Sequence, residues 1–240
     1  MKISYLVILL ILLMPKMAGQ EIDIKQLPPQ EMLEYGALFG NIEIVRLALT
    51  KGAEINYDEK LPLCSAIYGA NPPVSQEDGN FIEMMASVYG LSIPSRDTYL
   101  ELIKWLLENG AKATVLSDYN NSENIPLLKA ANYRDFEIVK LLLDFKANPN
   151  FKSQEGTTAL HMLTVPDPFP YPYKKAPEIA KLLISRGAKM ISSMDTPTAL
   201  QTAEEMLRSL EDSASPWRDY PFYDEMVNSV KSLIDIYGKL

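Results

Sequence analysis

The residues best suited to acid–base or nucleophilic chemistry are scarce in this sequence. It has one histidine, His161, and one cysteine, Cys64, among 240 residues. This count excludes a zinc site built from histidine and cysteine ligands, and no Cys-His or Ser-His pair stands out as a nucleophile with its base. Neither GxxxxGK[ST] nor GxGxxG occurs, so the usual phosphate-binding loops are missing from the sequence as well.

Carboxylates are the remaining candidates for catalysis, and some of them are adjacent, as in Asp58 and Glu59, Glu204 and Glu205, and Glu211 and Asp212. Adjacent carboxylates in an acidic protein usually form a solvated surface, and the sequence gives no sign that two of these pairs converge. We therefore predict no catalytic residue, no metal and no cofactor.

Two segments rich in proline and aromatic residues offer a different chemistry, that of binding. PDPFPYPYKKAP (166–177) has five prolines and three aromatic residues, and SPWRDYPFY (215–223) has a similar composition. Two interpretations stay open. The rings fold back over helix ends, or they contact a partner, because Tyr and Trp are favoured interface anchors. A polyproline ligand for an SH3-like module is a third and weaker interpretation.

The net charge narrows the class of partner. The formal net charge is −8, and it becomes −10 when residues 1–20, which contain two lysines, are removed. Phosphate groups would repel such a protein, so we expect neither nucleic acid nor anionic lipid as a partner. A basic protein surface would attract it.

The first twenty residues have the composition of a secretory signal peptide. Lys2 precedes an apolar run of twelve residues (3–14), and Pro15 ends that run. A membrane span needs about 20 apolar residues, so the run predicts a cleaved signal and not a stable anchor. We expect cleavage near Gly19, no stable membrane insertion afterwards, and a periplasmic or secreted location.

The elements that must position these residues repeat along the chain. Four segments begin with Glu, place apolar residues on one helical stripe and end on a turn: EIVRLALTKGAEIN (43–56), ELIKWLLENGAKAT (101–114), EIVKLLLDFKANPN (137–150) and EIAKLLISRGAKMI (178–191). A shorter element precedes three of them: LPLCSAIYG (61–69), IPLLKAANY (125–133) and TALHMLTV (158–165). EMLEYGALFGN (31–41) occupies that position in the first repeat, and TALQTAEEM (198–206) opens a fifth.

These two elements resemble the ankyrin repeat, in which a Thr-Pro-Leu-His-type start leads a short helix and a second helix ends at Gly-Ala. The resemblance covers nearly all of residues 28–240 and implies an all-α ankyrin-repeat solenoid of about five repeats. No single repeat can bury its apolar face alone, so neighbouring repeats must stack. We expect one domain over 21–240, with repeats at 28–57, 58–116, 122–151, 155–191 and 195–240.

The ends of the predicted helices carry suitable residues. Pro62 and Pro126 fit the first helical turn, where a missing N–H costs nothing. Gly52, Gly110 and Gly187 follow second helices, where a left-handed cap is needed, and Lys146 replaces glycine in the third repeat. We expect about 1 kcal/mol of local strain at that lysine.

Long insertions separate the two helices of repeats two, four and five. Gly110 follows Leu61 by 49 positions and Gly187 follows Thr158 by 29, whereas Gly52 follows Glu31 by 21 in the first repeat. The two aromatic-proline loops should therefore lie side by side on one edge, opposite the hairpin fingers. Within the insertion of repeat two, FIEMMASVYG predicts a short extra helix with Phe81, Met84, Met85 and Val88 on one face.

The resemblance also implies roles for single residues. His161 should hydrogen-bond the adjoining turn, and Cys64, in the same register, should be a small buried core residue. Ankyrin proteins generally bind partners through the fingers and the exposed side of the first helices, and the insertion edge is a second possible contact surface. The candidate partner-binding residues on these two surfaces are Tyr57, Asp58, Glu59, Asp118, Tyr119, Asn120, Tyr133, Phe169, Tyr171, Tyr173, Trp217, Tyr220 and Phe222.

The functional prediction is a non-catalytic protein-binding module, a monomer that binds another exported protein. By analogy with small exported bacterial ankyrin proteins, we first expect an immunity protein that neutralises a secreted toxin, such as a lipase from type VI secretion. Three alternatives stay open. They are a periplasmic accessory or scaffold protein linked to oxidative-stress defence, a secreted host-directed effector, and an enzyme whose site is formed by the insertions.

Overall fold

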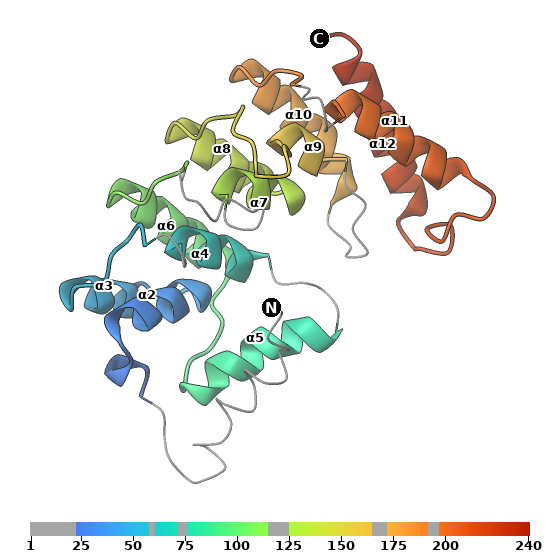
Figure 1. Cartoon of the computed structure of the whole chain (residues 1–240). Coiled ribbons are helices and arrows are strands. Elements are labelled where there is room, and N and C mark those ends of the chain that lie inside the picture. The colour runs from blue at the N-terminus through green and yellow to red at the C-terminus, as the bar shows by residue number, and fades with distance from the viewer. Residues whose placement is uncertain (1–22, 58–60, 72–75, 115–124, 165–171, 192–196) are drawn as a thin grey trace. The chain divides into compact units, whose positions relative to one another are not determined.

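Helices and their connecting loops make up all the residues that the structure describes. The structure is a computed structural model, and it describes residues 23–57, 61–71, 76–114, 125–164, 172–191 and 197–240; no strand occurs among them. The helices group into two compact units, Met1–Ala111 and Lys112–Leu240 (Figure 1). Each predicted repeat contributes its pair of helices to one of these units.

The first unit contains the helix pairs of repeats one and two. In each pair a first helix packs against a second, and the first helices α2 and α4 also pack against each other. The elements are η1 (Ile24–Gln26), α2 (Pro29–Leu38), α3 (Ile42–Thr50), α4 (Pro62–Ala70), α5 (Gln76–Val88) and α6 (Arg96–Glu108).

The extra helix predicted in the insertion of repeat two exists as α5, and Met85 and Val88, two of the four residues expected on its apolar face, are buried. Ile82, Met85 and Ala86 are buried at helical spacing, with Tyr89 one turn further on. Met84, expected on the same face, is only half-buried. The buried face is therefore wider than the predicted one, because Ile82, Ala86 and Tyr89 are also buried, and the side chain of Phe81 lies outside the description.

A tyrosine of α6 fixes the packing between the helices of the first unit. The Tyr99 hydroxyl donates a 2.8 Å hydrogen bond to the Leu38 carbonyl at the end of α2, and the Tyr99 side chain is 1% exposed. Gly69 of α4 lies against this pair, and a Cβ there would overlap the Leu38 carbonyl and the tyrosine ring. Only glycine fits this position without displacing the two helices.

The second unit contains repeats three to five. The first helices α7, α9 and α11 pack in sequence, and the second helices α8, α10 and α12 pack in a second row. The elements are α7 (Pro126–Asn132), α8 (Phe136–Asp144), α9 (Ala159–Met162), η3 (Tyr173–Lys175), α10 (Ala176–Ser185), α11 (Ala199–Glu211) and α12 (Tyr223–Tyr237).

The predicted helix ends are confirmed. Pro62 and Pro126 are the first residues of α4 and α7. Four second helices end with the same backbone hydrogen bond, in which the N–H of an alanine just past the helix donates to the carbonyl five residues earlier. The four bonds run from Ala53 to Ala48, from Ala111 to Leu106, from Ala147 to Leu142 and from Ala188 to Leu183. The residue before each of those alanines has positive φ: Gly52 at 95°, Gly110 at 96°, Lys146 at 67° and Gly187 at 90°.

The insertions of repeats four and five lie between the paired helices, as predicted. In repeat four, α9 ends at Met162 and α10 begins at Ala176, with η3 directly before α10. In repeat five, part of the surplus lengthens the helices themselves. The helices α11 and α12 have 13 and 15 residues, whereas α7 and α8 have 7 and 9.

Candidate partner-binding surfaces

The single histidine has a structural position. His161 Nε2 lies 2.8 Å from the Pro197 carbonyl, and Nδ1 accepts from the Thr158 N–H at 3.2 Å and contacts its hydroxyl at 2.7 Å. These contacts fit a neutral ring with the proton on Nε2, and burial lowers the pKa of His161 below its usual value. The expected bond to the adjoining turn is confirmed. Cys64 is buried, as expected.

The carboxylate pairs do not converge within the part of the chain that the structure describes. No group of three or more His, Cys, Asp or Glu side chains close enough to hold a metal occurs there. Glu204 and Glu205 are exposed on α11, and Glu211 forms an ion pair with Lys231 at 2.8 Å. These acids form a solvated surface of the second unit.

The finger residues are only partly described. Tyr57 is 40% exposed at the start of the first finger. Asp58, Glu59, Asp118, Tyr119 and Asn120 lie outside the described residues. Tyr133, expected on the exposed side of α7, is instead 8% exposed. Because the residue is buried, Tyr133 is not available to a partner.

Tyr173 gives a second correction to the predicted contact residues. Its side chain is 1% exposed, and the guanidinium of Arg134 lies over its ring. Its carbonyl accepts a 2.7 Å hydrogen bond from the Ser229 hydroxyl of α12. Tyr173 therefore joins three repeats from the inside and is a structural residue. Phe169 and Tyr171, in the same loop, lie outside the described residues.

A row of aromatic rings leads from Tyr173 to the surface. Phe222 stacks on Tyr173 with ring centres 5.8 Å apart, which confirms that these parts of the two aromatic loops are adjacent. Tyr220 lies 5.6 Å from Phe222, and Trp217 lies 5.1 Å from Tyr220. Trp217, Tyr220 and Phe222 are half-buried, and we call these three residues the aromatic cluster.

Hydrogen bonds to the end of α11 hold the loop that carries the aromatic cluster. Arg218 donates from Nε to the Asp212 carbonyl and from Nη2 to the Glu211 carbonyl, both at 2.9 Å. The Tyr223 hydroxyl donates to the Leu210 carbonyl at 2.8 Å. These bonds satisfy carbonyls that have no partner within α11. The rings are thus presented on a constrained loop, which lowers the entropy lost when a partner binds.

Acidic residues flank the aromatic cluster along the chain. Residues 211–225 contain five carboxylates and one basic residue, Arg218, whose guanidinium is bonded to carbonyls. Asp224 and Glu225 lie in the first turn of α12, where negative charge is also favourable to the helix. A half-exposed aromatic surface with a negative rim fits a partner that presents Arg or Lys side chains.

The sequence analysis missed the polar side chains that join one repeat to the next. Asn56 donates to the Gly110 carbonyl at 2.9 Å, and Asn150 donates to the Gly187 carbonyl at 2.8 Å. Asn at the end of two of the four second-helix segments, 43–56 and 137–150, was a signal for this role. Arg134 and Tyr237 carried no such signal, because neither residue recurs at the equivalent position of another repeat.

Comparison with known proteins agrees with this architecture. Residues 91–193 match the family model for ankyrin repeats (3 copies). An ankyrin repeat protein of Acanthamoeba polyphaga mimivirus is 28% identical over 107 residues, which is 40% of this chain and 19% of that protein. Ankyrin repeat and SOCS box protein 16 of Homo sapiens is 30% identical over 117 residues, which is 47% of this chain and 23% of that protein.

Residues 91–193 therefore match ankyrin repeats, and the fold class is the all-α ankyrin-repeat solenoid. Such repeats are protein-binding modules, and the family is generally non-catalytic. The chain spans about a fifth of the length of the curated relatives that it matches. Among the residues described, no helix has the length and apolar character needed to cross a bilayer.

Proposed function

We propose that this protein is an exported inhibitor that binds one secreted toxin, such as a lipase, and protects the periplasm from it. The ankyrin repeats supply the protein-binding scaffold. Lys2 and the apolar run 3–14 support export, and the net charge of −8 supports a basic partner. The proposed inhibitor acts by binding and not by catalysis.

The aromatic cluster is the observation that carries this proposal furthest. Trp217 and Tyr220 combine a large half-exposed aromatic area with a loop that Arg218 and Tyr223 constrain. Rigid aromatic residues of this kind are enriched among the residues that dominate binding energies. The carboxylates around them would speed association with a basic surface, more strongly at low salt.

The test begins with capture of partners by mature protein, residues 21–240, from the periplasm of the source organism and from culture medium of competing strains. We expect one stoichiometric partner, and we expect its enzymatic activity to fall to background at a one-to-one ratio. Weak, salt-sensitive capture of many proteins would contradict the proposal. So would a stoichiometric partner whose activity is unchanged.

Two variants locate the contact. Trp217→Ala combined with Tyr220→Ala should weaken binding by at least about tenfold, because each anchor is worth more than about 1 kcal/mol. Tyr57→Ala is the matched control, since Tyr57 is an exposed tyrosine of the first finger. If Tyr57→Ala alone weakens binding, the fingers and not the aromatic cluster contact the toxin.

A further inference from the structure

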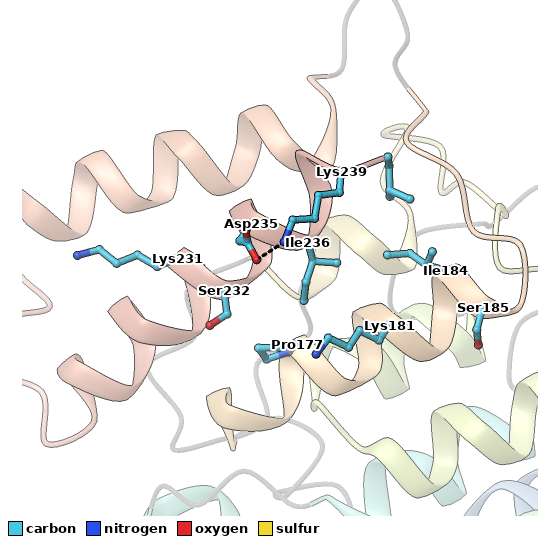
Figure 2. A pocket seen from close by; sticks show the side chains of 10 residues that line it. Pro177, Lys181, Ile184, Ser185, Lys231, Ser232, Asp235, Ile236 and Lys239 are labelled. Carbon is cyan, nitrogen blue, oxygen red and sulfur yellow. Dashed lines mark hydrogen bonds and ion pairs between the residues drawn. The ribbon is translucent and has the colours of Figure 1, made fainter.

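Ion pairs balance most of the charge at the open groove between α10 and α12. The groove has a volume of about 830 Å³. Lys239, which lines it, is paired with Asp235 at 2.7 Å (Figure 2), and Lys231 is paired with Glu211 at 2.8 Å. The groove therefore presents little free charge that could select a ligand, and a cavity in the first unit offers a more specific chemistry.

This cavity of the first unit has a volume of about 580 Å³ and lies between η1, the first turn of α3 and the residues that follow α5. Small-molecule sites typically have volumes of about 300–1,000 Å³. Apolar and polar side chains share its wall: Ile24, Ile44, Leu47 and Leu91 are apolar, and Asp23, Lys25, Asn41, Glu43 and Tyr89 are polar or charged. Apolar walls with a few polar groups are typical of sites for small ligands with an apolar body.

The Tyr89 hydroxyl is a buried polar group at the wall of this cavity. Tyr89 is 8% exposed, and its hydroxyl oxygen has no hydrogen-bond partner among the described residues. The Tyr89 ring is held in place by the rings of Tyr35 and Phe39, whose centres lie 5.5 and 6.0 Å away. Burial raises the pKa of Tyr89, so the hydroxyl keeps its proton and can donate it to an acceptor. A ligand that brings an acceptor atom to this hydroxyl would satisfy it.

Further donors lie at the start of α3. The side-chain oxygen of Asn41 accepts from the Ile44 N–H at 3.1 Å, and the NH₂ group of the same side chain is left to donate. The first N–H groups of a helix have no acceptor within the helix and carry a partial positive charge. Together with the Tyr89 hydroxyl, these donors favour a ligand that carries an acceptor oxygen.

The charges at the cavity nearly cancel. Asp23 and Lys25 have opposite signs, and Glu43 is paired with Arg46 at 3.3 Å. An ionised ligand would lose hydration on entering the cavity and would gain no unbalanced opposite charge in return. The lining therefore favours an uncharged acceptor, such as a carbonyl oxygen, over a carboxylate.

We propose that this cavity binds a small uncharged molecule that has an apolar body and a carbonyl group. The carbonyl oxygen accepts a hydrogen bond from the Tyr89 hydroxyl, and the apolar body covers the half-buried Leu47 and Leu91. The cavity lies in the first unit and the aromatic cluster in the second. The proposal therefore goes beyond the inhibitor function and does not depend on it.

The test titrates the mature protein with three probes of similar alkyl chain, N-hexylacetamide, octanoate and octylammonium, and follows binding by ligand-observed NMR. We expect N-hexylacetamide to bind at least about tenfold more tightly than either ion, because only the amide avoids the cost of burying a charge. Equal binding of the three probes would show apolar partition alone, and absence of amide binding would exclude this class of ligand. Either result would overturn the proposal. Tighter binding of octanoate would replace it with a carboxylate site.

Tyr89→Phe tests the contact with the carbonyl group. Phenylalanine keeps the ring that packs on Tyr35 and Phe39 but lacks the hydroxyl, so N-hexylacetamide should bind about tenfold more weakly. Tyr57→Phe is the matched control, because Tyr57 is an exposed tyrosine of the same unit that does not line the cavity. Equal affinity of the parent protein and Tyr89→Phe for the amide would overturn the proposed contact.

The melting temperature without any probe gives an independent check. Because the buried Tyr89 hydroxyl has no partner among the described residues, Tyr89→Phe should leave the melting temperature unchanged or raise it. A clear fall would show that the hydroxyl is already bonded within the protein, and it would overturn the proposal. Toxin inhibition by Tyr89→Phe should stay intact, so this test is separate from that of the inhibitor function.

Discussion

The guanidinium carbon of Arg134 lies 4.0 Å from the centre of the Tyr173 ring, and both side chains are 1% exposed. Arg134 follows α7 with a φ of 54°, and its Nη1 donates to the Asn132 carbonyl at 3.0 Å. The contact joins the turn of repeat three to the insertion of repeat four. Because Tyr173 also bonds Ser229 and stacks on Phe222, repeats three to five are joined at one buried point.

This arrangement predicts a large loss of stability for Tyr173→Ala. Removal of a buried aromatic ring leaves a cavity and uncovers the Arg134 charge, so the free energy of unfolding should fall by about 3–5 kcal/mol. Trp217→Ala, at the half-buried end of the same row of rings, should cost about 1 kcal/mol or less. Urea unfolding followed by circular dichroism measures both. Equal losses would mean that Trp217 is also a core residue.

Lys146→Gly should stabilise the protein by about 1 kcal/mol. Lys146 has a φ of 67°, a left-handed conformation that glycine adopts without the steric cost of a Cβ. Gly187→Lys makes the reverse change at the equivalent turn of repeat four, where φ is 90°, and should destabilise by a similar amount. Thermal unfolding of the two variants checks the opposite signs. A loss of stability in Lys146→Gly would show that its side chain contributes more than its backbone costs.

His161 should make the stability fall at mildly acidic pH. Its pKa in the folded protein lies below the ordinary value of 6.5, because burial disfavours the charged ring. The unfolded chain therefore takes up a proton near pH 6.5 that the folded chain does not. The contribution of His161 is fully present above about pH 6.5 and is lost as the pH falls from there through the folded pKa.

The matched variant for this prediction is His161→Gln. At the equivalent position of repeat five, the side chain of Gln201 already accepts the Thr198 N–H at 2.8 Å, so glutamine can replace the local bond without titrating. Unfolding free energies at about pH 7.5 and pH 5.5 should differ more for the parent protein than for the variant. An identical pH dependence in both would assign the acid sensitivity to carboxylates.

Tyr237→Phe should cost about 1–3 kcal/mol. The Tyr237 hydroxyl is buried and donates to the Leu160 carbonyl at 2.9 Å, and phenylalanine would leave that buried carbonyl without its donor. Burial also raises the pKa of Tyr237, so the hydroxyl keeps its proton throughout the neutral range. Tyr223→Phe removes a similar bond from a half-buried position and should cost less, because water can reach the Leu210 carbonyl. Denaturant midpoints of the two variants provide the comparison.

The sequence by itself determined the repeats, the helix pairs and the ends of the helices. The reason is that these features are local. An apolar stripe predicts a helix, proline at the first turn predicts its start, and Gly110 or Gly187 before an alanine predicts its end. The resemblance to the ankyrin repeat implied that His161 bonds the adjoining turn, and the contact with the Pro197 carbonyl agrees with this.

Only the tertiary structure decided which of the aromatic residues are buried. The segment 166–177 has no periodicity, so nothing in it separates a buried ring from an exposed one. Tyr173 is buried because Arg134, Phe222 and Ser229, from two other repeats, meet it there. The groove between α10 and α12 likewise depends on how two helices separated by more than thirty residues pack. Burial and charge at such places are properties of several segments together, and no single stretch of sequence contains them.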